Sequence, residues 1–499
     1  MNDRTSDAEP SGRSSLARDA IRSSLWTGLS QYWLFGLGLI KTVVLARLVP
    51  PEWFGVVALA QAWVSYLTLL RFDFRPAVLA SDEEPMLLSV QFWLENITAL
   101  TGFLLAGALW WFAPGLLSPP LWAAIIVLLS AALFTGLTST PMYMTEKHLR
   151  QDVIGRLTIF QSLLGLGVAS VLAWRGYYLP ALLMDAIMPA LVIGAGVAAL
   201  TRWRPRLVWD RQTARELFSF AFTMWTAALL GKIIFQLDDW LVGNIDRTRS
   251  RVWLSSGVLP EAYYSRAYVA GKMPMDVFAG MLSLIALPLY SRSAAAGRDT
   301  LLRAYRMATW LLAYMISFSS AFALIATEEV ITIILGENWL PTVPLFRLMS
   351  LFIIMRPLFQ NASQLLVAIR REKLMRQATF VQAVFIVVFC APAVWFWGAA
   401  GAAVVVSLMT LVGMVFAERY VSAELGERIW PLYLRPLVTG LLTLAVLALI
   451  APVLPANLWV SAGLKGAFCI VSFGTAIILT DRDNASRVWS FVRQARAHG

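Results

Sequence analysis

The stretch of residues 44–70, VLARLVPPEWFGVVALAQAWVSYLTLL, contains only two charged residues, Arg47 and Glu52. Apolar residues extend on both sides of its Pro50-Pro51 pair and leave room for one helix before the pair and another after it. Long, weakly charged segments are what a hydrocarbon layer about 30 Å thick requires of spanning helices. The stretch therefore predicts two membrane-spanning helices joined by a short turn that contains proline.

The whole chain has the composition of a protein whose solvent is the lipid bilayer. Of its 499 residues, 59% are hydrophobic and 14% are charged, and the mean hydropathy is +0.67. These values exclude a water-surfaced globular protein, a fibrous protein and a disordered chain. Cys390 and Cys469 both lie in apolar runs, so neither indicates a disulfide framework or a zinc site. The two histidines are too few for a histidine-based active site or metal site, and we expect no enzyme activity, metal or cofactor.

Apolar length along the chain predicts about fourteen membrane-spanning helices. They are placed at residues 22–46, 54–79, 87–113, 119–143, 155–175, 178–201, 214–244, 261–290, 304–335, 342–369, 374–397, 399–423, 431–454 and 458–480. The polar N-terminus lacks the apolar core and the cleavage site of a signal peptide, so the first apolar run is itself expected to span the membrane. The predicted fold class is an all-α polytopic membrane protein.

Basic residues gather in alternate connections between these helices, while the intervening connections APGLLSPP, GENWLP, WFWGAAG and APVLPANLW contain no Lys or Arg. By the positive-inside rule the basic connections are cytoplasmic, and an even helix count places both termini there as well. One connection departs from the rule, because Arg247, Arg249 and Arg251 fall on the predicted outer side, either as a solvated loop or as a contact for anionic headgroups or sugars. The net charge of +11 has no contiguous basic face, so nucleic acid is not an expected partner.

The turn at Pro51 and Glu52 has a counterpart further along the chain. The sequence runs LVGNI at residues 241–245, then an inserted stretch, then LPEAYYS at residues 259–265, so that Pro260 and Glu261 match Pro51 and Glu52. Such a repeat predicts two six-helix lobes and alternating access around a central cavity. The predicted parts are a cytoplasmic N-terminus 1–21, an N-lobe 22–201, a cytoplasmic linker 202–213, a C-lobe 214–423, two C-terminal helices 424–480 and a cytoplasmic tail 481–499.

Four segments resemble the bacterial polysaccharide transporter family of the multidrug/oligosaccharidyl-lipid/polysaccharide (MOP) superfamily. They are VLARLVPPEWFGVVALAQAWVSYLTLL, FQLDDWLVG, AYYSRAYVAGKMPMDVFAGMLSLIALPLYSR and ILGENWLPTVPLFRLMS. The resemblance covers roughly residues 22–425 in order and spacing. This chain departs from the family where Asp238 is followed by Asp239 instead of a basic residue, and the loop DRTRSRVWLSSGV is longer than usual.

The resemblance implies a V-shaped, MATE-like arrangement of the two lobes and a flippase activity. The substrate it implies is an undecaprenyl-pyrophosphate-linked oligosaccharide repeat unit, which would cross the bacterial inner membrane during exopolysaccharide, capsule or O-antigen assembly. The implied partners are this lipid-linked substrate, the membrane lipids, and a polysaccharide polymerase with its co-polymerase.

A flippase needs a polar path through a region that excludes charge, and the helix predicted at 214–244 supplies polar residues. A charge at the centre of a spanning helix costs about 2.5–3.5 kcal/mol, so such a charge usually faces protein or water. Trp225, Lys232, Gln236 and Asp239 follow helical spacing and share one face, whereas Asp238 lies about 100° around the helix. Lys232 and Gln236 therefore form a polar stripe, and Trp225 on the same face is the favoured residue for stacking on a sugar.

Helices 22–46, 54–79 and 261–290 contribute further polar residues to the predicted cavity. These candidates are Gln31 and Lys41, Gln61 and Arg75 along one side of helix 54–79, and Arg266 and Lys272. Together with Lys232 we expect them to form a series of cations that attracts the pyrophosphate. The alternatives are that Lys272 only neutralises Asp276, that Arg75 anchors the cytoplasmic side, and that Lys41 and Lys232 snorkel or pair with Asp239.

Acidic residues inside the predicted spans are candidates for ion coupling. They are Asp238, Asp239, Asp276, Asp185 and Glu95. An isolated carboxyl group in a membrane tends to bind a proton, and each of these could take up a proton or sodium. The alternative, which we favour for Glu95 and Asp185, is that the residue caps or bridges helices.

Two other functions remain open on sequence alone. A cation-coupled drug exporter of the same superfamily would have a smaller cavity dominated by acids, instead of lysines on three helices. A membrane polysaccharide polymerase or ligase would need a large external loop with catalytic Arg or His residues, and the external connections here are short.

Overall fold

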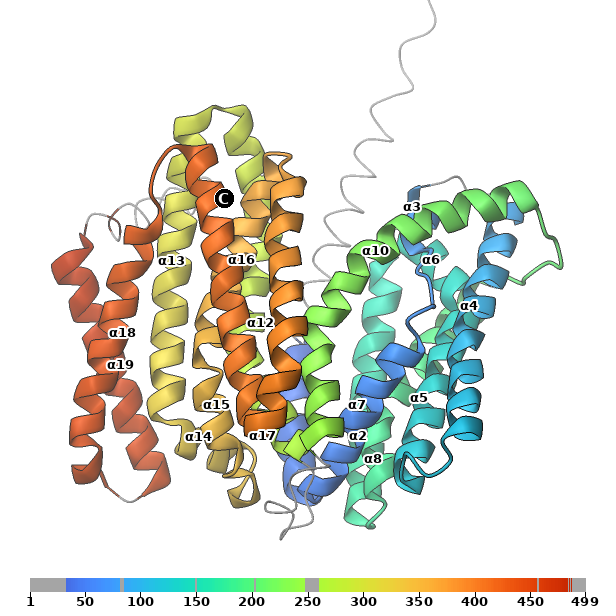
Figure 1. Cartoon of the computed structure of the whole chain (residues 1–499), viewed down its shortest axis with the longest axis horizontal. Coiled ribbons are helices and arrows are strands. Elements are labelled where there is room, and N and C mark those ends of the chain that lie inside the picture. The colour runs from blue at the N-terminus through green and yellow to red at the C-terminus, as the bar shows by residue number, and fades with distance from the viewer. Residues whose placement is uncertain are drawn as a thin grey trace, which may run out of the picture. The chain divides into compact units, whose positions relative to one another are not determined.

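The computed structural model describes residues 33–80, 85–148, 150–201, 203–246, 260–455, 457–482, 484 and 486, and within these ranges all regular structure is helical. Nine helices of the described residues are long and apolar enough to cross a membrane. The chain is therefore an all-α, multi-pass membrane protein, as predicted. Its contacts divide it into two compact units, residues 1–232 and 233–499, and the division falls within helix α10 (Figure 1).

The first unit contains a helix over residues 33–48 and the elements up to the first part of α10. Its elements are α2 (Pro51–Leu67), α3 (Arg75–Ala80), α4 (Pro85–Phe112), α5 (Pro119–Leu137), α6 (Ser139–Lys147), α7 (Gln151–Trp174), α8 (Tyr178–Met188), η1 (Pro189–Gly194), α9 (Ala195–Thr201) and α10 (Arg211–Leu241). Helix α5 packs against α2, α4 and α8, and α7 packs against α8. The start of α10 packs onto this unit through Ala214, Leu217 and Ala221, which contact Phe72 and Phe74.

The second unit begins in α10 and continues to the last described residues. Its elements are η2 (Val242–Asp246), α12 (Pro260–Ala295), α13 (Arg298–Ile325), α14 (Thr327–Ile334), η4 (Glu337–Trp339), α15 (Thr342–Leu348), α16 (Ser350–Ala368), α17 (Glu372–Leu425), α18 (Trp430–Ile450), η5 (Ala451–Val453) and α19 (Leu458–Thr480). Helix α16 packs against α12, α13 and α17, and α18 packs against α13 and α19. The core of this unit includes Tyr290, Tyr305 and Tyr433.

The two copies of the Pro-Glu repeat adopt the same local structure. Pro51 is the first residue of α2 and Pro260 is the first residue of α12, and each helix has its glutamate, Glu52 or Glu261, in the first turn. Proline suits the first helical position because its missing N–H would have no partner there. A carboxylate in the first turn interacts favourably with the positive end of the helix dipole. Each repeat therefore encodes the start of a helix.

The prediction of one helix over residues 54–79 is wrong, because α2 ends at Leu67 and a separate helix, α3, begins at Arg75. The Thr68 hydroxyl donates to the Val64 carbonyl at 2.7 Å, and the Asp73 carboxylate accepts from the Arg75 backbone N–H at 2.9 Å. Pro76 lies in the first turn of α3, where its missing backbone N–H costs no helical hydrogen bond, so it suits the start of a new helix. Arg75 therefore does not lie along one side of a helix with Gln61.

Three other predicted boundaries can be compared with the structure. The predicted helix 304–335 ends early, with α14 as a separate short helix, and the predicted helix 342–369 is divided at Met349 into α15 and α16. The break predicted between helices 374–397 and 399–423 is confirmed, because Gly398 inside α17 has φ 60° and ψ −144°. This backbone conformation is left-handed in φ and favours glycine. The total of fourteen helices and the V-shaped arrangement stay predictions.

Helices α18 and α19 are joined to the rest of their unit by polar contacts at both ends. At one end, Arg435 Nη1 donates to Asp481 Oδ1 at 2.6 Å and the Tyr314 hydroxyl donates to Asp481 Oδ2 at 2.7 Å. At the other end, Lys465 pairs with Glu329, which also accepts from Ser461 Oγ at 2.8 Å. Between these contacts α18 and α19 pack together and against α13. The two C-terminal helices therefore belong to the second unit structurally.

The Asp481 contact predicts a dependence of stability on pH. Burial raises the pKa of this carboxyl group, but hydrogen bonds from Tyr314 and Arg435 outweigh burial and hold the pKa below its usual value. The carboxylate therefore stabilises the fold fully above the unfolded-state pKa of about 3.9, and this contribution is lost as the pH falls through the lower folded-state pKa. We expect Asp481→Asn to lower the unfolding temperature near neutral pH and to flatten its decrease in acid, measured by thermal unfolding in detergent. Parallel acid profiles for the two proteins would contradict this.

Candidate functional site

Two side chains of α10 reach the C-terminal end of α2. Lys232 Nζ donates to the Ser65 carbonyl oxygen at 3.2 Å, and Trp225 Nε1 donates to the Leu69 carbonyl oxygen at 2.6 Å. Carbonyls at the end of a helix lack partners within the helix and carry its negative dipole, so a lysine is favourable there. Trp225 and Lys232 therefore lie on the face of α10 that meets α2, as their spacing predicted.

Arg71 stands beside this contact and was not among the predicted site residues. It lies in the segment between α2 and α3, where Nη2 is 3.4 Å from Glu95 Oε1 and 3.4 Å from Thr135 Oγ1. Arg71 follows the C-terminal end of α2, the end at which Lys232 meets the Ser65 carbonyl. With one continuous helix predicted over residues 54–79, the sequence favoured Arg75 as the candidate from this segment. Arg71 could have been identified from the sequence, because it is a second arginine inside a segment predicted to span the membrane.

Glu95 is the centre of a buried hydrogen-bond network in the first unit. It is 2% exposed and accepts from Gln91 Nε2 at 2.6 Å and from the Tyr143 hydroxyl at 3.2 Å, in addition to its contact with Arg71. Gln91 in turn accepts from the Thr140 hydroxyl at 2.8 Å. Buried polar groups require such partners. Glu95 thus bridges α4, α6 and the segment after α2, and a role in ion coupling stays a prediction.

Lys41 and Asp185 form an ion pair between the helix over residues 33–48 and α8. The Lys41 side chain is 16% exposed, whereas the Asp185 side chain is 64% exposed. Neither residue is isolated, although the sequence placed them in separate candidate groups. Because the lysine is largely covered and already paired, an incoming anion would reach it only by displacing Asp185.

Arg75 lies on α3 and pairs with Glu146 of α6, with Nε 2.7 Å from Oε2. Its side chain is half exposed, a geometry that fits the alternative of a surface anchor. Gln61 of α2 is exposed. Gln31 lies outside the described residues, as does the side chain of Asp276. Because Gln61 belongs to α2 and Arg75 to α3, the structure does not bring these two residues together on one helix face.

In the second unit Asp238 and Tyr264 form a buried pair, in which the tyrosine hydroxyl donates to Asp238 Oδ2 at 2.6 Å. Gln236, Asp239 and Arg266 are partly buried in this unit, and Lys272 is exposed. The Tyr264 contact joins α10 to α12. It gives Asp238 a structural partner, while ion coupling by Asp238 and Asp239 stays a prediction.

Trp225 belongs to an aromatic cluster in the first unit. Its ring stacks on Phe222 with centroids 5.5 Å apart and lies 5.7 Å from the Phe72 ring. Phe218 completes the cluster against Phe72 at 4.8 Å. Protein side chains thus already pack against this indole, and its predicted stacking on a sugar remains a prediction.

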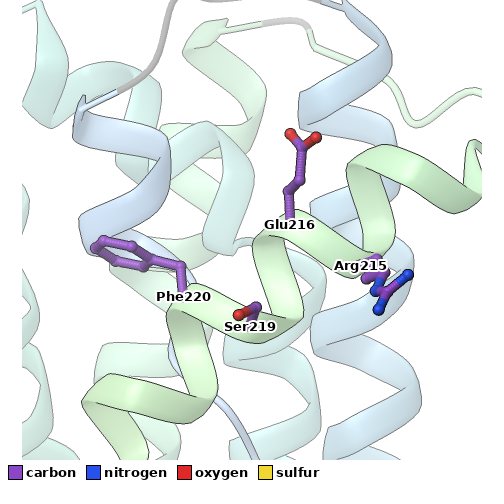
Figure 2. Close-up of a pocket in the computed structure, with 4 residues that line it drawn as sticks. All are labelled: Arg215, Glu216, Ser219 and Phe220. Carbon is purple, nitrogen blue, oxygen red and sulfur yellow. The ribbon is translucent and has the colours of Figure 1, made fainter.

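A pocket in the first unit lies apart from these cations. Figure 2 shows its lining residues Arg215, Glu216, Ser219 and Phe220, which all come from α10. A pocket lined by one helix is a surface depression, and it contains no predicted site residue. Within the described ranges, no three His, Cys, Asp or Glu side chains are grouped as a metal site would require.

Comparison with known proteins gives one family and several relatives. A family model described as polysaccharide biosynthesis protein matches residues 44–344. The succinoglycan biosynthesis transport protein ExoT of Rhizobium meliloti (strain 1021) is 24% identical over 346 residues, which are 67% of this chain and 66% of ExoT. The teichuronic acid biosynthesis protein TuaB of Bacillus subtilis (strain 168) is 21% identical over 72% of this chain and 73% of TuaB. The chain thus spans just under two thirds of the length of ExoT.

A solved structure of the lipid II flippase MurJ, in an inward closed conformation, has the same fold. It superposes with a TM-score of 0.71 at 14% identity, over 93% of this chain and 99% of the MurJ chain. The helical fold and the nine apolar helices of the described residues define a multi-pass membrane protein. The family model covers more than half of the sequence. The chain therefore belongs to the family described as polysaccharide biosynthesis protein, and the resemblance to a polysaccharide family found in the sequence is confirmed.

Proposed function

We propose that this protein is a flippase that translocates undecaprenyl-pyrophosphate-linked oligosaccharide repeat units across the bacterial inner membrane by alternating access. The exported units would serve exopolysaccharide, capsule or O-antigen assembly. ExoT is named for succinoglycan transport, TuaB for teichuronic acid biosynthesis, and MurJ for flipping lipid II. These names concern saccharide polymers or a lipid-linked precursor, which supports a substrate of that class for this chain.

The observation that carries the proposal is that two cations lie at the end of α2, Lys232 on the Ser65 carbonyl and Arg71 in the segment that follows the helix. Arg71 pairs with Glu95 at 3.4 Å, whereas Lys232 donates to a neutral carbonyl oxygen. A pyrophosphate would compensate both with charge-assisted hydrogen bonds. Lys41 supplies a third cation once the anion displaces Asp185.

Lobes with the predicted boundaries 22–201 and 214–423 would rock against one another, with helices 424–480 attached to the second. Both termini would be cytoplasmic, which agrees with the charge of the alternate connections. The proposed partners are the lipid-linked substrate, membrane lipids, and a polymerase with its co-polymerase that receives the exported unit.

The test is a deletion of the gene followed by analysis of the lipid-linked intermediate that accumulates and of the leaflet in which it resides. A flippase defect should trap the complete repeat unit in the inner leaflet. Accumulation of the same unit in the outer leaflet would instead identify the missing step as polymerisation. A strain that accumulates no lipid-linked saccharide in either leaflet would reject the substrate class.

A further inference from the structure

Arg356 is a buried arginine of the second unit that the sequence analysis did not single out. It lies in the second turn of α16 and is 7% exposed. Its guanidinium carbon lies 4.3 Å from the ring centroid of Phe235 on α10 and 5.5 Å from that of Phe359 on α16. Among the described residues, its Nε and Nη1 have no hydrogen-bond partner. Within the described ranges this charge therefore lies against aromatic rings and is part of no ion pair.

Two other buried charged residues of the second unit have ion-pair partners. Lys465 pairs with Glu329, and Asp481 pairs with Arg435. A buried cation without an anion costs several kcal/mol, of which a contact with an aromatic face returns about 0.5–2 kcal/mol. Two donor atoms of Arg356 are unpaired in the part of the chain that the structure describes, so burying this side chain lowers the stability of the fold. No contact among the described residues compensates fully for that loss.

The Arg356 guanidinium itself is suited to an anion with several oxygens, because it is buried and two of its donor atoms have no partner among the described residues. The ring of Tyr268 on α12 packs 5.1 Å from that of Phe352, which lies one turn before Arg356 on α16. A guanidinium presents donors in the fixed geometry that matches the oxygens of phosphate.

We propose that Arg356 is an anion-binding residue of the second unit and receives a phosphate of the lipid-linked substrate during transport. The proposal rests on the proposed function, since that function supplies the anion. The site is almost closed here, so the phosphate reaches it when the side chain swings off the Phe235 ring or when α16 and α10 move apart. Between transport cycles, when no phosphate is bound, the Arg356 guanidinium lies on the Phe235 ring.

The test compares Arg356→Met, Arg356→Lys and a control, Arg347→Met, in the full chain reconstituted in nanodiscs. Arg347 of α15 is exposed and already pairs with Glu328 at 3.0 Å, so its loss tests arginine removal outside the site. The probes are undecaprenyl pyrophosphate and, as the uncharged reference, undecaprenol. We expect Arg356→Met to weaken binding of undecaprenyl pyrophosphate about tenfold or more and Arg356→Lys to weaken it less, with undecaprenol unaffected.

Thermal unfolding without ligand separates a binding role from a structural one. Methionine has a similar length and no charge, so we expect Arg356→Met to raise the unfolding temperature, and Arg347→Met to leave both stability and binding near wild type. Undiminished binding of undecaprenyl pyrophosphate by Arg356→Met, or a lower unfolding temperature, would overturn the inference and leave the proposed function intact. If the wild type binds undecaprenyl pyrophosphate through Arg356 and yet a deletion strain traps no lipid-linked unit, the anion site stands and the proposed function fails.

Discussion

Lys232→Ala should abolish transport while the protein still folds and inserts into the membrane. The lysine lies where α10 meets the end of α2, and its loss removes one of the two neighbouring cations proposed to bind the pyrophosphate. The structural loss is one hydrogen bond to the Ser65 carbonyl, worth about 1 kcal/mol. The transport loss is larger, because it removes a charge from a site of low dielectric.

The measurement is complementation of a flippase-null strain, with the amount of protein in the membrane determined in parallel. Lys232→Arg retains the charge and should keep part of the activity, whereas Lys373→Ala at the exposed start of α17 should complement like the wild type. Full complementation by Lys232→Ala would remove Lys232 from the proposed site. Loss of the protein from the membrane would assign the lysine to folding.

We expect the second large effect on transport activity from substitutions in the ion pair of Lys41 and Asp185. Lys41→Ala should reduce transport at least about tenfold, because it removes a cation that can form charge-assisted bonds with the substrate. Asp185→Asn should retain transport, since it frees the lysine for the anion. The double variant Lys41→Asp/Asp185→Lys restores an ion pair but moves the cation to α8, and we expect it to remain inactive.

Each alternative for this pair gives a different pattern in the same transport assay. Activity regained in the exchanged double variant would show that the pair only joins two helices. Inactive Asp185→Asn with normal membrane insertion would support the alternative that Asp185 couples transport to an ion. The membrane level of each variant serves as the control for folding.

Much of the fold followed from local patterns. Apolar length identified the membrane-spanning segments, and the Pro-Glu repeats marked the starts of α2 and α12 because their effects act within the first helical turn. Helical spacing placed Trp225 and Lys232 on one face, and both side chains reach the end of α2. The end of α2 at Leu67 was not predicted, because apolar residues continue beyond it. As a result Arg71, in the segment after α2, was not among the predicted site residues.

The sequence by itself determined that this protein lies in the membrane, that it is helical and which family it belongs to, since these depend on composition, periodicity and local motifs. Only the tertiary structure decided which ions have partners. Lys41 meets Asp185 across 144 positions, whereas Arg356 lies against the rings of Phe235 and Phe359. Pairing between distant helices depends on how their faces pack, and a hydropathy pattern specifies that a face is apolar or polar without specifying which face it will meet.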